Sequence, residues 1–210
     1  MRECSIAIVG ATGAVGSELL KVLEERNFPT GLVRVIASPR SVGKTLTFKD
    51  RLLTIEEINS DSFQGIDIAF ISVSAEISRA LAPIAIASGC IVIDDSSAFR
   101  MDHSVPLVVP EINADDLNQH NGIIAVPNCS TTQMVMALYP LHRKSPIRRI
   151  IVDTYQAVSG TGAGAMNELK EQTFAYLNGR SYFPNIYPHP IAFNVIPQVE
   201  DFLDNGYTKE

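Results

Sequence analysis

The sequence predicts an α/β protein: a doubly wound parallel sheet, followed by the first part of an α+β domain. Short apolar runs alternate with amphipathic helical patterns through the first 129 residues, and a glycine-rich loop separates the first run from the first helix. The pattern then changes, and residues 178–197 are rich in Pro, Asn, Tyr and His and look irregular. We therefore place a Rossmann-like domain at residues 1–129 and a second domain at 130–210.

Each predicted strand is a short apolar run, which is typical of a strand buried on both faces of a parallel sheet. In the first domain these runs are 5–9, 32–37, 52–57 (expected at an edge), 67–73, 90–93, 106–109 and 122–126. After the first run, four apolar positions share one helical face: Val15, Leu19, Leu20 and Leu23. Further helices are expected at 77–88, where Pro83 should kink the helix or lie in its first turn, and at 114–120, where Asn113 is a suitable N-cap.

The second domain begins with a helical pattern at 131–142, followed by a strand-like run at 149–155. A second glycine-rich loop, S-G-T-G-A-G-A, comes next and leads into a helical pattern at 166–177. The order helix, strand, loop and helix differs from the regular alternation of the first domain. We therefore read this part as the beginning of a separate α+β domain.

The composition argues against several kinds of partner. The 210-residue chain has a net charge of −6, so nothing suggests binding to nucleic acid or to an anionic membrane. No apolar run approaches the ~18 residues that span a bilayer, and the N-terminus reads as a strand, not as a signal peptide. Cys4, Cys90 and Cys129 show neither disulfide nor metal-ligand spacing. We expect a protein of the reducing cytoplasm, with no metal site.

The first glycine loop is a candidate phosphate site. Gly10, Gly13 and Gly16 form G-x-x-G-x-x-G between a strand and a helix. Glycines there allow a tight turn and a close approach of the backbone to a phosphate, whose charge the helix N-terminus favours. The spacing departs from the commoner G-x-G-x-x-G, so a plain strand-to-helix turn stays an alternative.

The loop after the second strand indicates which cofactor would bind. An NAD site usually has an acidic residue there for the ribose hydroxyls, but this chain has Ser38, Arg40, Ser41 and Lys44. Cations and hydroxyls suit a ribose 2′-phosphate, so the loop favours NADP. A solvated basic loop is the alternative.

Cys129 is the candidate nucleophile. It stands where a strand ends and a helix begins, flanked by Asn128, Ser130 and Thr131. Unpaired N–H groups at a helix N-terminus favour a thiolate and could also hold an oxyanion formed by its attack on a carbonyl. Most lone cysteines are small buried apolar residues, and we read Cys4 and Cys90 in that way.

Together these stretches resemble the bacterial aspartate-semialdehyde dehydrogenases. The matching motifs run in order over nearly the whole chain: G-A-T-G-A-V-G, A-S-P-R-S-V-G-K, D-D-S-S-A-F-R-M, V-P-L-V-V-P-E-I-N, N-G-I-I-A-V-P-N-C-S-T-T-Q, D-T-Y-Q-A-V-S-G-T-G-A-G-A and H-P-I-A-F-N-V-I-P-Q. Asp153 and residues 72–74 depart from the family's usual residues. The resemblance implies an NADP-dependent oxidoreductase that interconverts L-aspartate 4-semialdehyde and 4-aspartyl phosphate, on the route to lysine (through diaminopimelate), threonine and methionine.

The resemblance also implies residue roles. Cys129 matches the nucleophile, Gln156 the residue that orients the substrate, and Arg100 the arginine that binds phosphate, whose planar fork suits an oxyanion. Asn128 lies beside the nucleophile and could help to polarise the carbonyl. The implied cofactor residues are Gly10, Thr12, Gly13, Ala14, Val15, Ser38, Arg40, Ser41, Ser159 and Gly160.

By the same resemblance, residues beyond Glu210 would supply a glutamate, a lysine, the arginine that grips the substrate carboxylate and the histidine that acts as general base. We expect the chain to match the N-terminal ~60% of such an enzyme and to have little or no dehydrogenase activity by itself, because losing a general base removes ~10²–10⁴ in rate. His142 and His189 are not expected to replace the base. The second domain would serve catalysis and dimerisation, in a homodimer or homotetramer whose small-molecule partners are the substrate and inorganic phosphate.

Two alternatives remain open. An N-acetyl-glutamyl-phosphate reductase would share the fold and the thioester route, but such enzymes usually have tyrosine and proline soon after the cysteine, where this chain has S-T-T-Q. The other alternative is a catalytically inactive NADP-binding module, since the general base is not in view.

Overall fold

The computed structural model describes residues 2–208, and these form two compact units that divide between Thr154 and Tyr155. Each unit is described here by itself. The division falls later than the predicted domain boundary at 129/130, because the helix that follows Cys129 contacts elements of the first unit. The boundary between compact units and the boundary read from the sequence pattern thus fall at different residues. The domain boundary at 129/130 stays a prediction.

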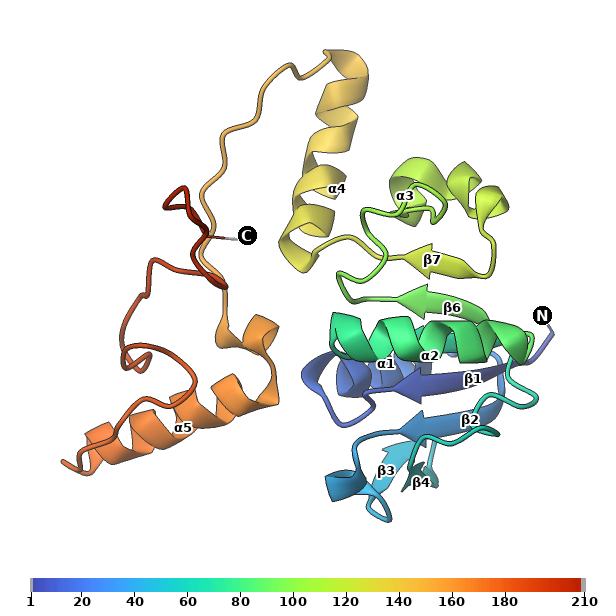
Figure 1. Cartoon of the computed structure of the whole chain (residues 1–210), viewed down its shortest axis with the longest axis horizontal. Helices are drawn as coiled ribbons and strands as arrows, with labels where there is room; N and C mark the ends of the chain where they lie inside the picture. Colours follow the sequence, from blue (N-terminus) through green and yellow to red (C-terminus); the bar gives the residue numbers. More distant parts are fainter. Residues whose placement is uncertain (1, 209–210) are drawn as a thin grey trace. The chain divides into compact units, whose positions relative to one another are not determined.

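A seven-stranded sheet forms the centre of the first unit (Figure 1). Its strands are β1 (Cys4–Val9), β2 (Thr30–Ile36), β3 (Thr45–Phe48), β4 (Arg51–Glu56), β5 (Ile68–Ile71), β6 (Ile91–Asp94) and β7 (Ile123–Ala125). They lie in the order β3-β4-β2-β1-β5-β6-β7, and every pair is parallel except β3 with β4. This order confirms the predicted doubly wound sheet.

Helices occur in both units. The α-helices are α1 (Ala14–Glu25), α2 (Ala75–Ala87), α3 (Pro110–Asn113), α4 (Cys129–Lys144) and α5 (Ala163–Leu177), and the 3₁₀ turns are η1 (Pro39–Ser41), η2 (Ala114–Gln119) and η3 (Val158–Thr161). None of these helices, within the part of the chain that the structure describes, is long and apolar enough to cross a bilayer.

Both faces of the sheet are buried along its central strand β1, which explains why this strand is continuously apolar. Along β1, Ile6 and Ile8 pack into the cluster that contains Leu20 of α1. The alternate residue Ala7 packs into the other cluster, with Leu81 of α2. Successive side chains of a strand point to opposite faces, so α1 and α2 cover opposite sides of the sheet.

The predicted strand at 106–109 is wrong. Only a single bridge forms there, between Leu107 and Ala125. Pro110 begins α3 directly afterwards, so no ladder can develop. Asn113 does stand at the N-cap position of η2, but its side chain makes no cap bond: its Oδ1 accepts from the Val109 N–H instead.

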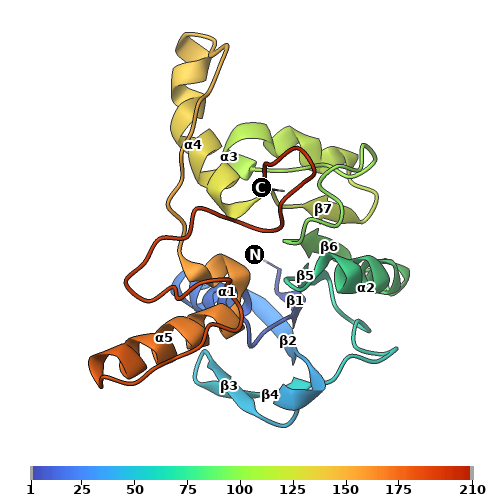
Figure 2. The ribbon, with the colours of Figure 1, turned by 60° about the vertical axis from the view of Figure 1, so that its left-hand side comes forward.

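Of the two strands of the β3–β4 hairpin, only β4 was predicted, as the run at 52–57. Figure 2 shows the hairpin at one end of the sheet. Lys49 and Asp50 form its turn, both with positive φ. That conformation usually takes Asn-Gly or Asp-Gly, so Lys-Asp carried no turn signal and β3 was missed. Consequently β3, and not the predicted run at 52–57, is the edge strand.

Two other predictions differ in detail. Residues 149–155 were expected to form a strand, but they pair with no strand among residues 2–208 and therefore have no ladder. Pro83 lies inside α2 and not in its first turn. By contrast, the irregular character of residues 178–197 is confirmed, since no helix or strand occurs there.

Candidate active site

Most predicted site residues of the first unit lie at one edge of the sheet. The glycine loop follows β1, the basic loop follows β2, Arg100 follows β6, and Cys129 follows β7. These strands run parallel, so their carboxyl ends meet at the same edge (Figure 1). Ligands of doubly wound sheets bind at this edge.

The glycine loop is tightly folded. Gly10 has a φ of +88°, and a Cβ built on it would lie 2.2 Å from the carbonyl oxygen of Ser72. A Cβ on Gly16 would lie 2.4 Å from the Gly10 oxygen, so the first turn of α1 packs directly on the loop. Gly13 is the N-cap of α1, and no side chain caps this helix. The N-terminal N–H groups of α1 are thus available for a phosphate, and the loop fits a dinucleotide.

The basic loop adjoins the glycine loop. The N–H groups of Gly10 and Ala11 both donate to the carbonyl of Ile36, the last residue of β2. The turn η1, which begins at Pro39, presents Arg40 to solvent, and this guanidinium makes no ion pair with any residue from 2 to 208. Its charge is therefore available for a ligand.

Cys129 is the first residue of α4 and is exposed. Asn128 caps the helix: its Oδ1 accepts from the N–H groups of Ser130 (3.0 Å) and Thr131 (3.2 Å). We expected unpaired N–H groups at this helix N-terminus, but the cap occupies these two. Within residues 2–208, neither the N–H of Cys129 nor the side-chain NH₂ of Asn128 donates to an acceptor, so both remain as donors.

Arg100 joins the ends of two strands. Its Nε donates to the carbonyl of Val126 at 2.9 Å, and its Nη2 donates to the carbonyl of Asp95 at 2.8 Å. Because a guanidinium has five N–H donors, several remain for an anion. Arg100 is held near the Asn128–Cys129 turn by main-chain contacts, which no sequence pattern indicated.

Asp95 and Ser72 lie at the same edge of the sheet and were not predicted as site residues. They follow β6 and β5, and the Ser72 hydroxyl donates to Asp95 Oδ2 at 3.2 Å. Burial raises the pKa of Asp95, although the bond from Ser72 and the charge of Arg100 act in the opposite direction. The D-D-S-S motif was visible in the sequence, but the partner from another strand was not.

Asp95→Asn should raise the thermal midpoint of unfolding at pH 7. Because the pKa of Asp95 is raised, the folded chain holds this proton more tightly than the unfolded chain. The stabilisation of the fold by this bound proton is complete below the pKa of about 4 that Asp95 has in the unfolded chain. It is lost as the pH rises through the pKa of Asp95 in the folded chain. Asparagine is always neutral and can still accept from Ser72, so its advantage should be full at pH 7 and vanish near pH 3.

Asp102→Asn is the matched control. Bonds from Ser104 lower the pKa of this exposed carboxyl, so its ionised form is the favoured one when folded. Neutralising Asp102 should not raise the midpoint at pH 7. Thermal scans of both variants between pH 3 and pH 8 test the pair, and an Asp95→Asn midpoint at or below wild type at pH 7 contradicts the argument.

Three predicted residues belong to the second unit. Ser159 and Gly160 lie in η3. Gln156 lines a shallow hollow of about 510 Å³ together with Ile191 and Phe193. The first unit does not contain these residues, and their roles stay predictions.

Among residues 2–208, no group of three or more His, Cys, Asp or Glu side chains is arranged to hold a metal ion.

The geometry of the first unit defines a class of protein. A parallel sheet with an uncapped, glycine-lined helix after β1 is a dinucleotide-binding domain, and the exposed cysteine after β7 adds a thiol at the same edge. The sequence model described as "Semialdehyde dehydrogenase, NAD binding domain" matches residues 5–120, and the one described as "Semialdehyde dehydrogenase, dimerisation domain" matches residues 138–210. The chain belongs to the semialdehyde dehydrogenase family.

Known relatives agree with this assignment. The chain is 51% identical to the aspartate-semialdehyde dehydrogenase of Bacillus subtilis and 52% identical to that of Aquifex aeolicus, covering 100% and 98% of this chain. It spans 62% of the length of each relative. Among solved structures, aspartate semialdehyde dehydrogenase II of Vibrio cholerae, complexed with ASA, has a TM-score of 0.91 at 44% identity, covering 100% of this chain and 63% of that one.

Proposed function

We propose that this protein is an NADP-dependent, phosphate-dependent aspartate-semialdehyde dehydrogenase. Its reaction would proceed through a thioester on a cysteine. The observation that carries the proposal is the exposed Cys129 at the start of α4, on the same sheet edge as the glycine loop and Arg100. The names of the relatives point to the same substrate. Lysine, threonine and methionine synthesis is the proposed context.

Cys129 would perform the central steps. Its thiolate would add to the aldehyde carbon and form a hemithioacetal, whose oxygen the Cys129 N–H and the Asn128 amide would stabilise. A bound nicotinamide would supply the acceptor for the hydride that leaves this carbon. The carbonyl then re-forms as an acyl thioester. Phosphate attacks the thioester, the C–S bond breaks, and the products are 4-aspartyl phosphate and the free thiolate.

Arg100 and Gln156 would bind the two reactants. The donors of Arg100 that the main chain leaves open suit a phosphate, and its bonds to Val126 and Asp95 keep the guanidinium at the edge of the sheet. Gln156 would orient the aldehyde substrate. Mixing the whole protein with aspartate semialdehyde, NADP⁺ and phosphate should produce NADPH, and omitting phosphate should stop sustained turnover. Sustained turnover without phosphate, or none with all three, contradicts the proposal.

Ser38, Arg40 and Ser41 would select NADP over NAD. Arg40→Ala should weaken NADP binding about 10- to 100-fold, the range expected for a lost charge-assisted hydrogen bond. NAD binding should change by less than about twofold, since NAD has no phosphate there. Fluorescence titration of both cofactors measures the preference.

Arg26→Ala controls for the loss of one positive charge. Arg26 is exposed at the C-cap of α1, at the other end of this helix from the glycine loop. It should leave both affinities unchanged. If Arg40→Ala keeps the wild-type preference, or if wild type binds both cofactors equally, the reading of the basic loop is wrong.

The remaining assignments concern assembly and location. We propose a homodimer or homotetramer, consistent with the dimerisation-domain match at residues 138–210. A cytoplasmic location is proposed from the three free cysteines, because a reducing compartment keeps thiols available for catalysis.

A further inference from the structure

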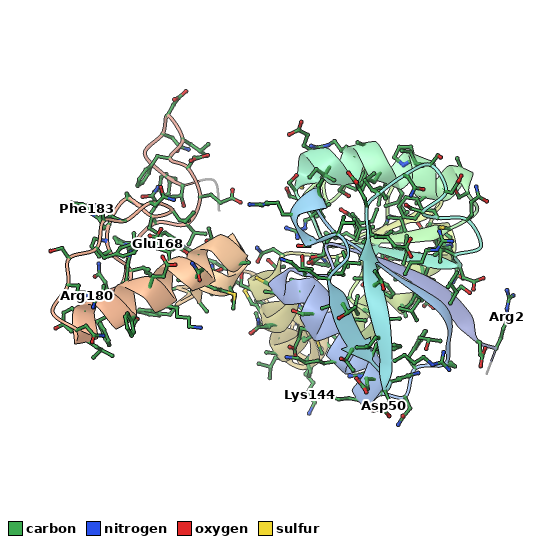
Figure 3. The ribbon with its side chains drawn as sticks, turned by 90° about the horizontal axis from the view of Figure 1, so that it is seen from below. Arg2, Asp50, Lys144, Glu168, Arg180 and Phe183 are labelled. Atoms are coloured by element: carbon green, nitrogen blue, oxygen red, sulfur yellow. The ribbon has the colours of Figure 1, made fainter. Side chains whose placement is uncertain are left out.

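In the second unit, α5 holds the irregular segment that follows it through two buried polar side chains. Glu168 and Gln172 are each 3% exposed, one turn apart on the helix, and Gln172 Nε2 donates to Glu168 Oε1 at 3.1 Å. Figure 3 shows Glu168 on the side of α5 that faces this segment. Buried polar groups need partners, and the segment provides them from its own backbone.

The carboxylate of Glu168 accepts consecutive backbone N–H groups. Its Oε2 accepts from Asn185 at 3.1 Å and from Ile186 at 2.6 Å, and its Oε1 lies 3.5 Å from the Tyr187 nitrogen. Gln172 Oε1 accepts from two further N–H groups, those of Ile191 and Ala192. Bonds from a rigid helix thus define the position of the Tyr187 backbone, although the segment has no regular structure.

From this fixed position, the Tyr187 side chain reaches η3. Its hydroxyl donates to Thr161 Oγ1 at 3.0 Å. Thr161 is the last residue of η3, the turn that also contains Ser159 and Gly160. A 3₁₀ turn of this length has poor internal hydrogen-bond geometry, and Gly162 follows it with a φ of +95°. Such a turn is easily displaced, so an external bond at its end restricts it substantially.

We propose that Tyr187 is a positioning residue for the cofactor: through Thr161, it holds Ser159 and Gly160 in the conformation that binds NADP. This inference rests on the proposed function, together with the cofactor role that the family resemblance implies for Ser159 and Gly160. The chain of contacts runs from the buried Glu168 to the Tyr187 backbone, and from the Tyr187 hydroxyl to η3. Tyr187 does not itself touch the reacting atoms.

Tyr187→Phe tests the proposal because it removes only the hydroxyl. The variant should bind NADP about three- to tenfold more weakly, the range expected for one neutral hydrogen bond that orders a binding loop. Amide hydrogen exchange of residues 158–162 should become faster, whereas the thermal midpoint should stay close to wild type. Thr161→Val should have the same effect, and the double variant should be no worse than either single one.

Tyr182→Phe is the matched control. Tyr182 is also half-buried in the same segment, and its hydroxyl donates to Glu171 Oε2 of α5 at 3.3 Å, not to η3. It should leave both NADP affinity and exchange of residues 158–162 unchanged. A merely structural role of the tyrosines would affect the two variants alike.

Each outcome is decisive. Faster exchange with weaker NADP binding in Tyr187→Phe alone supports the proposal. Unchanged exchange overturns it, as does faster exchange with unchanged NADP affinity. If wild type does not bind NADP at all, the proposed function fails first, and this inference fails with it.

Discussion

Cys129 should react with iodoacetamide at least about ten times faster than Cys4 or Cys90 in the folded protein near neutral pH. The thiolate is the reactive form, so both access and ionisation determine the rate. Cys129 is exposed at the start of α4. Burial, and secondarily the charge of Asp67, raises the pKa of both Cys4 and Cys90. The Cys90 side chain is also buried, whereas Cys129 is open to the reagent.

Peptide mapping after a limiting dose of reagent measures the three rates. NADP should slow labelling of Cys129 and leave the other two unchanged, because only Cys129 lies at the cofactor edge of the sheet. Cys129→Ala should abolish NADPH formation by the whole protein and preserve NADP binding. Equal labelling of all three thiols in protein shown to be folded would remove the physical basis for the nucleophile.

Gly10→Ala should destabilise the protein by more than about 3 kcal/mol and abolish cofactor binding. Two separate costs arise. A left-handed backbone costs a non-glycine residue roughly 1–2 kcal/mol, and the new Cβ would lie 2.2 Å from the Ser72 oxygen. That oxygen belongs to the main chain directly after β5, so it cannot move without disturbing the sheet. Urea unfolding followed by circular dichroism measures the loss.

Gly89→Ala separates the two costs. Gly89 has a φ of +89°, nearly identical to that of Gly10, but no atom lies within 4 Å of the position that an added Cβ would take. It should therefore lose only about 1 kcal/mol, from the backbone conformation alone. Similar losses in the two variants would show that the close approach to Ser72 does not determine the role of Gly10.

The sequence predicted elements best where local pattern and environment agree. The strands β1, β2, β5, β6 and β7 coincide with predominantly apolar runs, and α1, α2, α4 and α5 follow helical spacing. The predictions failed where pairing decided the outcome. Residues 106–109 and 149–155 have strand-like composition, but a strand exists only when a neighbour completes its hydrogen bonds.

The candidate site divides in the same way. Gly10, Arg40 and Cys129 could be placed because a strand, a turn and a helix within a few residues determine their local geometry. Asparagine is a common N-cap residue, but we did not predict from the sequence that Asn128 would cap α4. Its side chain occupies the N–H groups of Ser130 and Thr131, and this reduces the donors available to an oxyanion.

The sequence by itself determined the alternation of strands and helices, the glycine loop and the position of the cysteine, because these depend on residues close together in the chain. Only the tertiary structure decided which distant groups meet: Ser72 with Asp95, Arg100 with the Val126 carbonyl, and Tyr187 with Thr161. The physical reason is that a hydrogen bond requires its atoms to lie about 3 Å apart, and strand order and packing determine that separation for residues far apart in sequence.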